Sequence, residues 1–203
     1  MIDSAAPEPA PGTPNYRLAR TIVLVGLMGA GKTSVGKRVA ARLAVPFTDS
    51  DSEIEAAAGM TIPEIFANFG EPDFRDGERR VIARLLTEVP RVLATGGGAF
   101  IEPRTREAIA EGGISVWIRA EVEVLWARVR GKPGRPLLEA PDPRGRLEEL
   151  DRLRSPVYAQ ADITVDSTRE ASHEVMAQRI IDAVLEHDRL HPERPPTLEI
   201  VTP

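Results

Sequence analysis

The chain has 203 residues, a length that suits one domain with an ample core. Hydrophobic residues make up 42% and charged residues 28%, which is typical of a globular protein in water. The net charge of -5 argues against a general nucleic-acid-binding protein, which would carry a basic surplus. The sequence has no cysteine, so disulfides, thiolate metal sites and thiol nucleophiles are excluded.

The two ends of the chain differ in composition from the rest. MIDSAAPEPAPGTPNYRLAR lacks the basic and then apolar layout of a secretion signal. This segment and the C-terminal HPERPPTLEIVTP have the composition of disordered regions. No run of 18 apolar residues occurs, so we expect no membrane span. We therefore expect a disordered extension over residues 1–19, one folded domain over 20–188 and a disordered tail over 189–203, in a cytoplasmic protein.

Short apolar runs alternate with amphipathic segments between these tails. The runs predicted to be strands are residues 21–26, 45–49, 91–99, 114–120 and 161–166. The segments predicted to be helices are residues 32–44, 51–59, 61–86, 103–111, 121–129, 144–158 and 169–188. This alternation predicts an α/β fold of three layers, α/β/α, with a central five-stranded parallel sheet. Ligands of such sheets bind beyond the carboxyl ends of the strands.

The motif GLMGAGKT (26–33) fits the phosphate-binding pattern G-x-x-x-x-G-K-[ST] and lies between a predicted buried strand and a predicted helix. Its glycines allow backbone N–H groups to approach phosphate oxygens, and the helix N-terminus adds partial positive charge. Lys32 can supply a full charge to the β- and γ-phosphates, and the Thr33 hydroxyl can hold Mg²⁺. The motif predicts a site for a nucleoside triphosphate with magnesium.

The stretch FTDSD (47–51) follows the second predicted strand and carries two carboxylates. If the chain is extended there, Asp49 and Asp51 point to the same side. Asp49 could then bind Mg²⁺, directly or through water, while Asp51 could orient or deprotonate an acceptor hydroxyl. The simpler alternative is a solvated turn that caps the next helix.

Three arginines lie in distinctive contexts. Arg75 in DFRDGE precedes Glu78 by three residues, so Glu78 can brace it across one helical turn. Arg154 lies in LRSPVY, and Arg135 lies in the loop GKPGRPLL. A guanidinium matches a carboxylate or a phosphate with its planar fork. The glycines of TGGGA (95–99), at the end of a predicted strand, allow backbone N–H groups to meet a ligand.

The motifs GLMGAGKT, DSD, FRDGE, GGG, RPLL and RSPVY, in this order and at these spacings, resemble those of the shikimate kinase family. The resemblance covers roughly residues 20–185. The phosphate loop alone is shared by many enzymes, whereas DSD with FR-x-x-E and GGG is much more specific. The resemblance implies a P-loop, nucleoside monophosphate kinase-like fold. It also implies phosphoryl transfer from ATP to the 3-hydroxyl of shikimate, a step of aromatic amino acid biosynthesis.

The resemblance further implies roles for individual residues. Arg75 and Arg154 would grip the shikimate carboxylate, while Asp51 and the backbone of Gly97 and Gly98 would hold ring hydroxyls. The implied ATP-binding residues are Gly29, Ala30, Gly31, Lys32, Thr33, Ser34, Arg128 and Arg135. The implied catalytic residues are Lys32, Asp51 and Arg135, with Arg135 in a lid of about residues 130–141. Thr33 and Asp49 would hold Mg²⁺, and the loop DSTREAS (166–172) would lie near the adenine.

Three alternatives remain open from the sequence. A gluconate kinase acts on another hydroxylated carboxylate and is the closer enzymatic alternative. A nucleoside monophosphate kinase is less favoured because no dense second set of arginines occurs. A non-catalytic ATP-binding module would require neither Asp51 nor Arg135. For the favoured enzyme we expect a monomer that binds shikimate and MgATP, with no nucleic acid and no membrane as partner.

Overall fold

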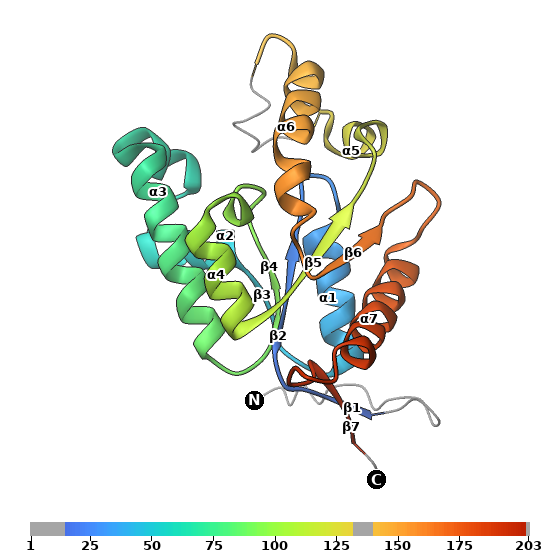
Figure 1. Ribbon diagram of the computed structural model, residues 1–203. Coiled ribbons are helices and arrows are strands. Elements are labelled where there is room, and N and C mark those ends of the chain that lie inside the picture. Colours follow the sequence, from blue (N-terminus) through green and yellow to red (C-terminus); the bar gives the residue numbers. More distant parts are fainter. Residues whose placement is uncertain (1–14, 132–139, 202–203) are drawn as a thin grey trace, which may run out of the picture.

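A five-stranded parallel sheet forms the centre of the protein, whose computed structural model describes residues 15–131 and 140–201. Its strands are β2 (Thr21–Val25), β3 (Phe47–Asp49), β4 (Val92–Ala94), β5 (Gly113–Arg119) and β6 (Ile163–Asp166). They are arranged in the order β3-β4-β2-β5-β6, and every neighbouring pair is parallel (Figure 1). The predicted sheet is thus confirmed.

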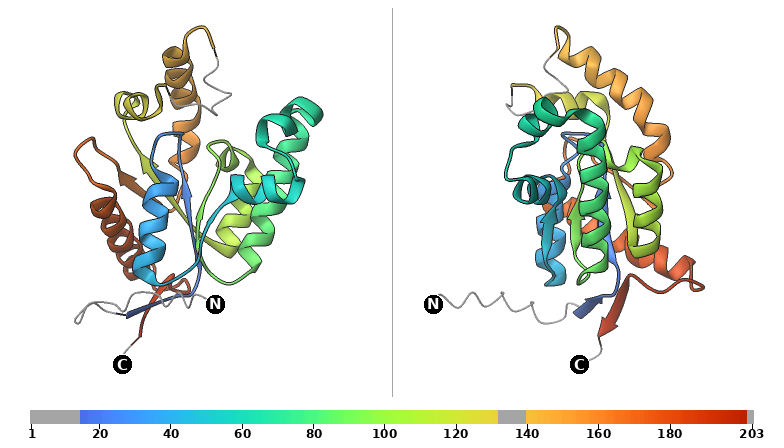
Figure 2. Two further views of the ribbon diagram at one scale, coloured as in Figure 1. Left: turned by 180° about the vertical axis from the view of Figure 1, so that it is seen from behind. Right: turned by 90° about the vertical axis from the view of Figure 1, so that its left-hand side faces the viewer.

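Helices cover both faces of this sheet (Figures 1 and 2). On one face α1 (Lys32–Leu43) packs beside α7 (His173–Leu190), and on the other α3 (Ile62–Thr87) packs beside α4 (Pro103–Gly112). The remaining helical elements are α2 (Ser50–Ala58), the short 3-10 helix η1 (Ala99–Ile101), α5 (Val122–Val129) and α6 (Pro143–Tyr158). The central strand β2 is buried throughout, which explains its uninterrupted apolar sequence.

Local sequence features explain where the long helix α3 begins and where it is interrupted. Thr61 and Glu64 form the predicted capping box at its start. Gly70 interrupts the helix with φ 81° and ψ 175°, a conformation that favours glycine. The segment after this break carries Arg75 and Glu78.

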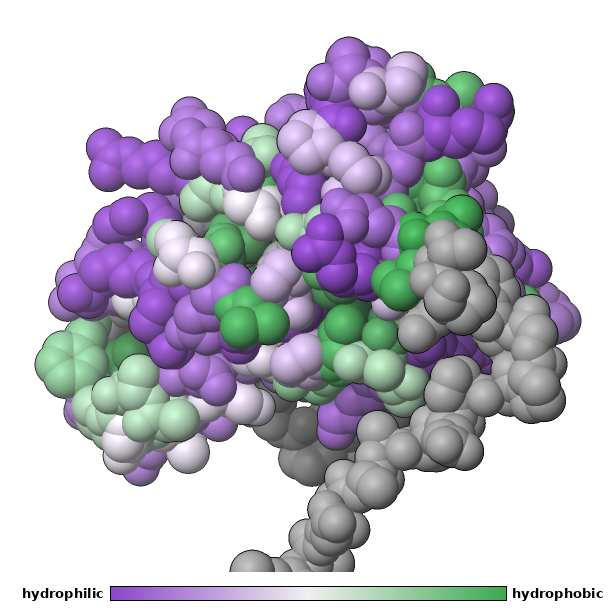
Figure 3. Space-filling model, turned by 90° about the horizontal axis from the view of Figure 1, so that it is seen from below, coloured by the Kyte–Doolittle hydropathy of each residue, from purple (hydrophilic) through white to green (hydrophobic). Residues whose placement is uncertain are grey.

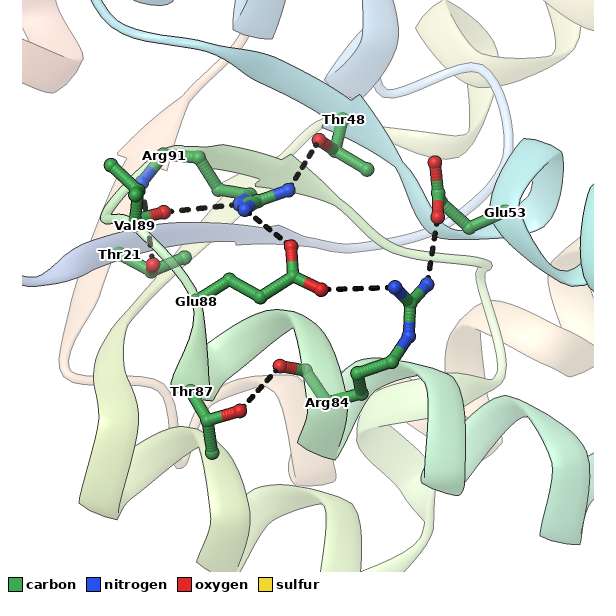
Figure 4. A network of polar contacts seen from close by, with 8 residues as sticks. All are labelled: Thr21, Thr48, Glu53, Arg84, Thr87, Glu88, Val89 and Arg91. Carbon is green, nitrogen blue, oxygen red and sulfur yellow. Dashed lines mark hydrogen bonds and ion pairs between the residues drawn. The ribbon is translucent and has the colours of Figure 1, made fainter.

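A network of polar contacts ties α2 and α3 to the sheet (Figure 4). Arg84 of α3 donates to Glu53 of α2 at 2.8 Å and to Glu88 at 2.9 Å. Arg91, directly before β4, donates to Glu88 at 2.6 Å and to Thr48 of β3 at 3.2 Å. These contacts link the two helices to the strands β3 and β4, whose carboxyl ends carry the predicted site motifs.

The structure corrects the prediction that both tails are disordered. β1 (Asn15–Leu18) pairs antiparallel with β7 (Leu198–Val201), and α7 continues to Leu190. Residues 1–14 and 202–203 lie outside the described part of the chain. The folded domain therefore extends at both ends beyond the predicted limits of residues 20 and 188.

Side-chain hydrogen bonds between distant parts of the sequence stabilise this terminal sheet, and amino-acid composition does not reveal them. Asp188 Oδ2 accepts from the backbone N–H groups of Thr197 at 2.8 Å and Leu198 at 3.0 Å. Arg17 Nε donates to Glu199 Oε2 at 2.9 Å, across 182 residues of sequence. Such a pairing depends on the positions of distant segments, so a local reading of either proline-rich tail misses it.

The underside of the molecule, near the two termini, is largely hydrophilic with scattered apolar patches (Figure 3). Burial in β7 decreases along the strand, because Leu198 at its start is 4% exposed whereas Ile200 is 69% exposed. Over residues 15–131 and 140–201, no helix combines the length and the apolar character that crossing a membrane requires.

The terminal sheet makes a prediction about stability. Leu198→Ala should lower the free energy of unfolding by about 2–4 kcal/mol, because it removes buried methyl groups and leaves a cavity. Ile200→Ala, the matched control at an exposed position of the same strand, should change it by less than about 0.5 kcal/mol. Urea unfolding of both variants measures the two values. Equal small effects would show that β7 is not part of the folded core in solution.

Candidate active site

The predicted phosphate loop connects β2 to α1. Gly26, Gly29 and Gly31 adopt φ values of 133°, 84° and 102°, which are unfavourable for any residue that has a Cβ atom. A Cβ at Gly29 would also lie 2.6 Å from Val129 Cγ1 of α5. The loop conformation therefore depends on glycine at these positions, as the motif predicts.

The side chains that follow the loop converge on its mouth. Lys32 Nζ donates to the carbonyl oxygens of Gly26 at 2.7 Å and Leu27 at 3.0 Å, so the ammonium folds back over the loop. Thr33 Oγ1 donates to Asp49 Oδ2 at 2.8 Å. The two predicted metal ligands are thus brought together. A hydroxyl and a carboxylate at contact distance fit Mg²⁺, which prefers oxygen ligands and keeps several waters.

FTDSD divides between a strand and a helix. β3 ends at Asp49 and α2 begins at Ser50, so the extended geometry expected through Asp51 is wrong. Asp49 Oδ1 accepts from the Asp51 N–H at 3.1 Å and caps α2. The capping alternative is therefore confirmed for Asp49, and the other oxygen of the same carboxylate still faces Thr33.

Asp51 lies in the first turn of α2 in a buried environment. Burial raises the pKa of Asp51 to about 6, and the neighbouring Asp49 carboxylate adds to the rise. Lys32 opposes the rise. Asp51 Oδ1 is buried and has no hydrogen-bond partner within the described ranges. This oxygen is available to accept a hydrogen bond from a ligand hydroxyl.

Two of the three glycines of TGGGA, Gly96 and Gly98, make room for charged side chains that include the predicted acceptor-binding residues Asp51 and Arg75. A Cβ at Gly96 would lie 2.7 Å from both Asp51 Oδ1 and Glu78 Oε1. At Gly98 a Cβ would lie 2.5–2.7 Å from the Arg75 guanidinium. Any larger residue at either position would displace these groups. We call residues 96–98 the glycine turn.

Arg75 reaches the glycine turn from α3 and is fixed by two carboxylates. Its Nη1 donates to Glu78 Oε2 at 2.6 Å, which confirms the predicted brace, and its Nη2 donates to Glu71 Oε1 at 3.2 Å. Glu78 is 2% exposed, and burial raises its pKa even though Arg75 opposes the rise. Glu78 Oε1 has no hydrogen-bond partner in the described part of the chain.

Arg154 reaches the same turn from α6. Its Nη1 donates to the carbonyl oxygen of Gly97 at 3.0 Å. The guanidinium groups of Arg75 and Arg154 therefore contact successive residues of one turn, although 79 positions separate them in the sequence. Among the described residues, no group accepts from the N–H groups of Gly97 and Gly98. The turn thus offers two donors beside two cations.

An open cleft of about 810 Å³ runs from the phosphate loop to the glycine turn. The predicted residues that line it are Gly29, Gly31, Lys32, Thr33, Ser34, Asp49, Asp51, Gly97 and Arg128. Ala30 is buried behind the loop surface. Arg135, the predicted lid arginine, lies outside the described residues, as does most of the predicted lid.

Arg128 links the phosphate loop to the loop after β6. Its Nη1 donates to Gly29 O at 3.3 Å and Ser167 Oγ at 3.0 Å, and its Nη2 donates to Thr168 O at 3.0 Å. The predicted adenine loop DSTREAS supplies three further lining residues: Arg169, Ala171 and Ser172. Arg128 and this loop therefore lie together at one end of the cleft.

Sequence reasoning missed three residues of the cleft wall: Arg38, His173 and Glu174. Arg38 Nε donates to Glu174 Oε1 at 2.7 Å, and Arg38 Nη1 donates to Ser34 O at 2.8 Å. Their signal in the sequence is that of exposed helix positions. Only the packing of α1 against α7 brings them beside the phosphate loop.

The raised pKa of Asp51 predicts a dependence of stability on pH. An acid whose folded pKa exceeds its unfolded value destabilises the protein once it ionises, so its cost is absent below about pH 4 and complete above about pH 6. Asp51→Asn should therefore raise the free energy of unfolding by about 2–3 kcal/mol at pH 8 and by almost nothing at pH 4. Denaturant unfolding at both pH values measures this difference.

The control for this experiment is Asp73→Asn, which removes one negative charge from an exposed position. It should change stability by less than about 0.5 kcal/mol at either pH. An Asp51→Asn gain that is the same at pH 4 and pH 8 would contradict the assignment, because it would not follow ionisation.

Comparison with known proteins connects this geometry to a family. A family model described as shikimate kinase matches residues 28–185. A shikimate kinase of Paramagnetospirillum magneticum is 56% identical over 169 residues, which cover 83% of this chain and 86% of the relative. A shikimate kinase of Bradyrhizobium diazoefficiens is 53% identical over 169 residues, which cover 83% of this chain and 81% of the relative.

Solved structures agree. The shikimate kinase of Acinetobacter baumannii in complex with shikimate superposes with a TM-score of 0.79 at 40% identity, covering 82% of this chain and 93% of that one. A gluconokinase of Sinorhizobium meliloti reaches a TM-score of 0.59 at 19% identity, covering 88% of this chain and 99% of that one, and so shares the fold alone. The chain belongs to the shikimate kinase family.

Proposed function

We propose that this protein transfers the γ-phosphoryl group of ATP to the 3-hydroxyl of shikimate, giving shikimate 3-phosphate and ADP in aromatic amino acid biosynthesis. One observation carries the choice of acceptor. The guanidinium groups of Arg75 and Arg154 meet at the glycine turn, which Asp51 also contacts, next to the phosphate loop. Two cations suit one carboxylate, and an unpaired carboxylate oxygen suits hydroxyl groups.

The nucleotide phosphates would bind in the phosphate loop, which begins at Gly26. Backbone N–H groups of Gly29, Gly31 and Ser34 would bind phosphate oxygens at the start of α1. The Ala30 N–H, which donates to Leu27 O at 3.2 Å, would turn from this carbonyl to join them. Lys32 would turn from its two carbonyl partners to the β- and γ-phosphates. Exchanging neutral carbonyl partners for anionic oxygens strengthens its hydrogen bonds.

Thr33 and Asp49 would hold Mg²⁺ through the Thr33 hydroxyl and Asp49 Oδ2, which now contact each other. The chemistry supplied by a bound Mg²⁺ would be positive charge that stabilises the negative charge of the transferring phosphoryl group. Asp49 would keep its second oxygen on the α2 N-terminus, so that the cap also orients the ligand. A serine at this position could cap the helix equally well, but it could not also supply a carboxylate oxygen to the metal.

Shikimate would bind on the α3 side of the cleft. Arg75 and Arg154 would receive its carboxylate, and the N–H groups of Gly97 and Gly98 would donate to ring oxygens. Asp51 would accept a hydrogen bond from the 3-hydroxyl and so orient the hydroxyl oxygen toward the γ-phosphorus. As the new P–O bond forms, the bond to the β-phosphate oxygen breaks, the hydroxyl proton passes late to the Asp51 carboxylate, and ADP leaves. The loose transition state of phosphoryl transfer demands little proton abstraction, so orientation is the main task of Asp51.

Two roles rest on the family resemblance together with position. Arg128 lies beside DSTREAS and would contact the adenine end of ATP. Arg135 would close over the phosphates as part of the lid. We also propose that the protein acts as a monomer in the cytoplasm, with shikimate and MgATP as its binding partners.

A coupled assay of ADP release separates the candidate functions. With MgATP, shikimate should stimulate ADP release at least about 10³-fold over MgATP alone, because a positioned hydroxyl replaces water as the acceptor. Gluconate at the same concentration should give no stimulation. Release that depends on gluconate would support the other small-molecule kinase, and tight ATP binding without turnover would support the non-catalytic module.

Removal of Arg75 tests recognition of the carboxylate. Arg75→Ala should reduce kcat/KM for shikimate by an amount equivalent to about 2–5 kcal/mol, since it leaves a buried anion without its partner. KM for MgATP should change little. The control is Arg80→Ala on the same helix, whose side chain is 70% exposed. A loss for Arg75→Ala no larger than that for Arg80→Ala would reject the role.

A further inference from the structure

Tyr158, in the last turn of α6, is a buried residue that the proposed mechanism leaves without a role. The residue is 1% exposed, and its ring centroid lies 5.9 Å from that of Trp117 in β5. Its hydroxyl donates to the carbonyl oxygen of Gly97. Because packing in the core fixes the orientation of the ring, it also fixes the position of the hydroxyl donor at the end of the ring.

The same carbonyl oxygen accepts from Arg154, one helical turn earlier on α6. A carbonyl oxygen has two lone pairs, so it can accept both hydrogen bonds at once. Arg154 therefore shares its protein partner with Tyr158. This sharing matters because a guanidinium that turns to a ligand must give up part of its existing hydrogen bonding.

Binding of a carboxylate would draw the Arg154 donors toward the ligand. Without Tyr158, the Gly97 carbonyl would then lose its remaining partner inside a half-buried turn, at a cost comparable to one hydrogen bond. With Tyr158 in place, the carbonyl keeps a donor. The planar trans peptide also fixes the Gly98 N–H on the side opposite the Gly97 oxygen. The direction of one predicted ligand donor therefore depends on the Tyr158 hydroxyl.

We propose that Tyr158 is a positioning residue for the acceptor: its hydroxyl holds the Gly97–Gly98 peptide and allows Arg154 to bind the carboxylate. This inference rests on the proposed function. Burial raises the pKa of Tyr158 to about 12, so the hydroxyl keeps its proton and remains a donor at physiological pH. The position of Tyr158 in RSPVY, four residues after Arg154, places both donors on one face of the helix.

The test is Tyr158→Phe, which keeps the ring against Trp117 and removes only the hydroxyl. The expected result is a roughly five- to tenfold increase in KM for shikimate, the effect of about one hydrogen bond. The kcat value and KM for MgATP should stay within about twofold, because the hydroxyl does not touch the phosphate loop. Tyr16→Phe in β1, the only other tyrosine of the chain, is the matched control and should leave all three constants unchanged.

A double-mutant cycle separates positioning from a general loss of packing. In an Arg154→Lys background, Tyr158→Phe should change KM for shikimate by less than about twofold, because both residues act on one carboxylate contact. Additive effects would overturn the inference. A Tyr158→Phe protein that fails to fold would also overturn it, because the hydroxyl would then serve the fold.

The wild-type enzyme distinguishes this inference from the function on which it rests. If it neither binds nor phosphorylates shikimate, the proposed function is wrong and the role of Tyr158 falls with it. If it phosphorylates shikimate while Tyr158→Phe and Tyr16→Phe give the same KM, only the role of Tyr158 is wrong.

Discussion

The candidate acceptor site depends on the close approach of charged side chains to a backbone without Cβ atoms. At Gly96 and Gly98, carboxylate and guanidinium atoms lie 2.5–2.7 Å from the positions that Cβ atoms would occupy. Asp51 comes from α2, whereas Glu78 and Arg75 come from α3, and none could approach so closely beside a larger residue. The glycine turn thus fixes where the start of α2 and the middle of α3 must lie relative to β4. Contacts of Arg84 and Arg91 elsewhere on these elements hold the same arrangement.

This arrangement buries carboxylate oxygens without hydrogen-bond partners in the described part of the chain, which lowers the stability of the folded protein. Asp51 Oδ1 and Glu78 Oε1 are buried without partners in the described ranges, and both carboxyl groups have raised pKa values because they are desolvated. Unpaired buried acceptors normally destabilise a protein. Here they lie beside the glycine turn, in which the Gly97 and Gly98 N–H groups have no acceptor among the described residues. Under the proposed function, a ligand that brings hydroxyl groups to these oxygens would recover part of the stability lost.

Most of the fold could be predicted from the sequence because its signals are local. The buried run at residues 21–25, the phosphate-loop glycines and the Thr61 capping box each act within a few residues. Most of the candidate site residues could also be proposed from the sequence, since they lie in short motifs. The terminal sheet was missed because its pairing joins both ends of the chain. Asp51 was placed on an extended chain, although residues 51–59 were predicted to be a helix, because the spacing of the two carboxylates fits an extended chain as well as a helix cap. Arg38 and Glu174 were missed because only the α1–α7 contact brings them to the cleft.

Fold similarity by itself leaves the acceptor undetermined. The gluconokinase neighbour shares the fold at 19% identity, so the sheet and its helices do not distinguish the two chemistries. The phosphate loop fixes only the donor nucleotide. The distinction must lie in the side chains that α2, α3 and α6 bring to the strand ends. Under the proposed function, two guanidinium groups on adjacent glycines would bind a planar anion, and the nearby Asp51 would position a hydroxyl. Substrate identity would then be a property of one turn and its neighbours.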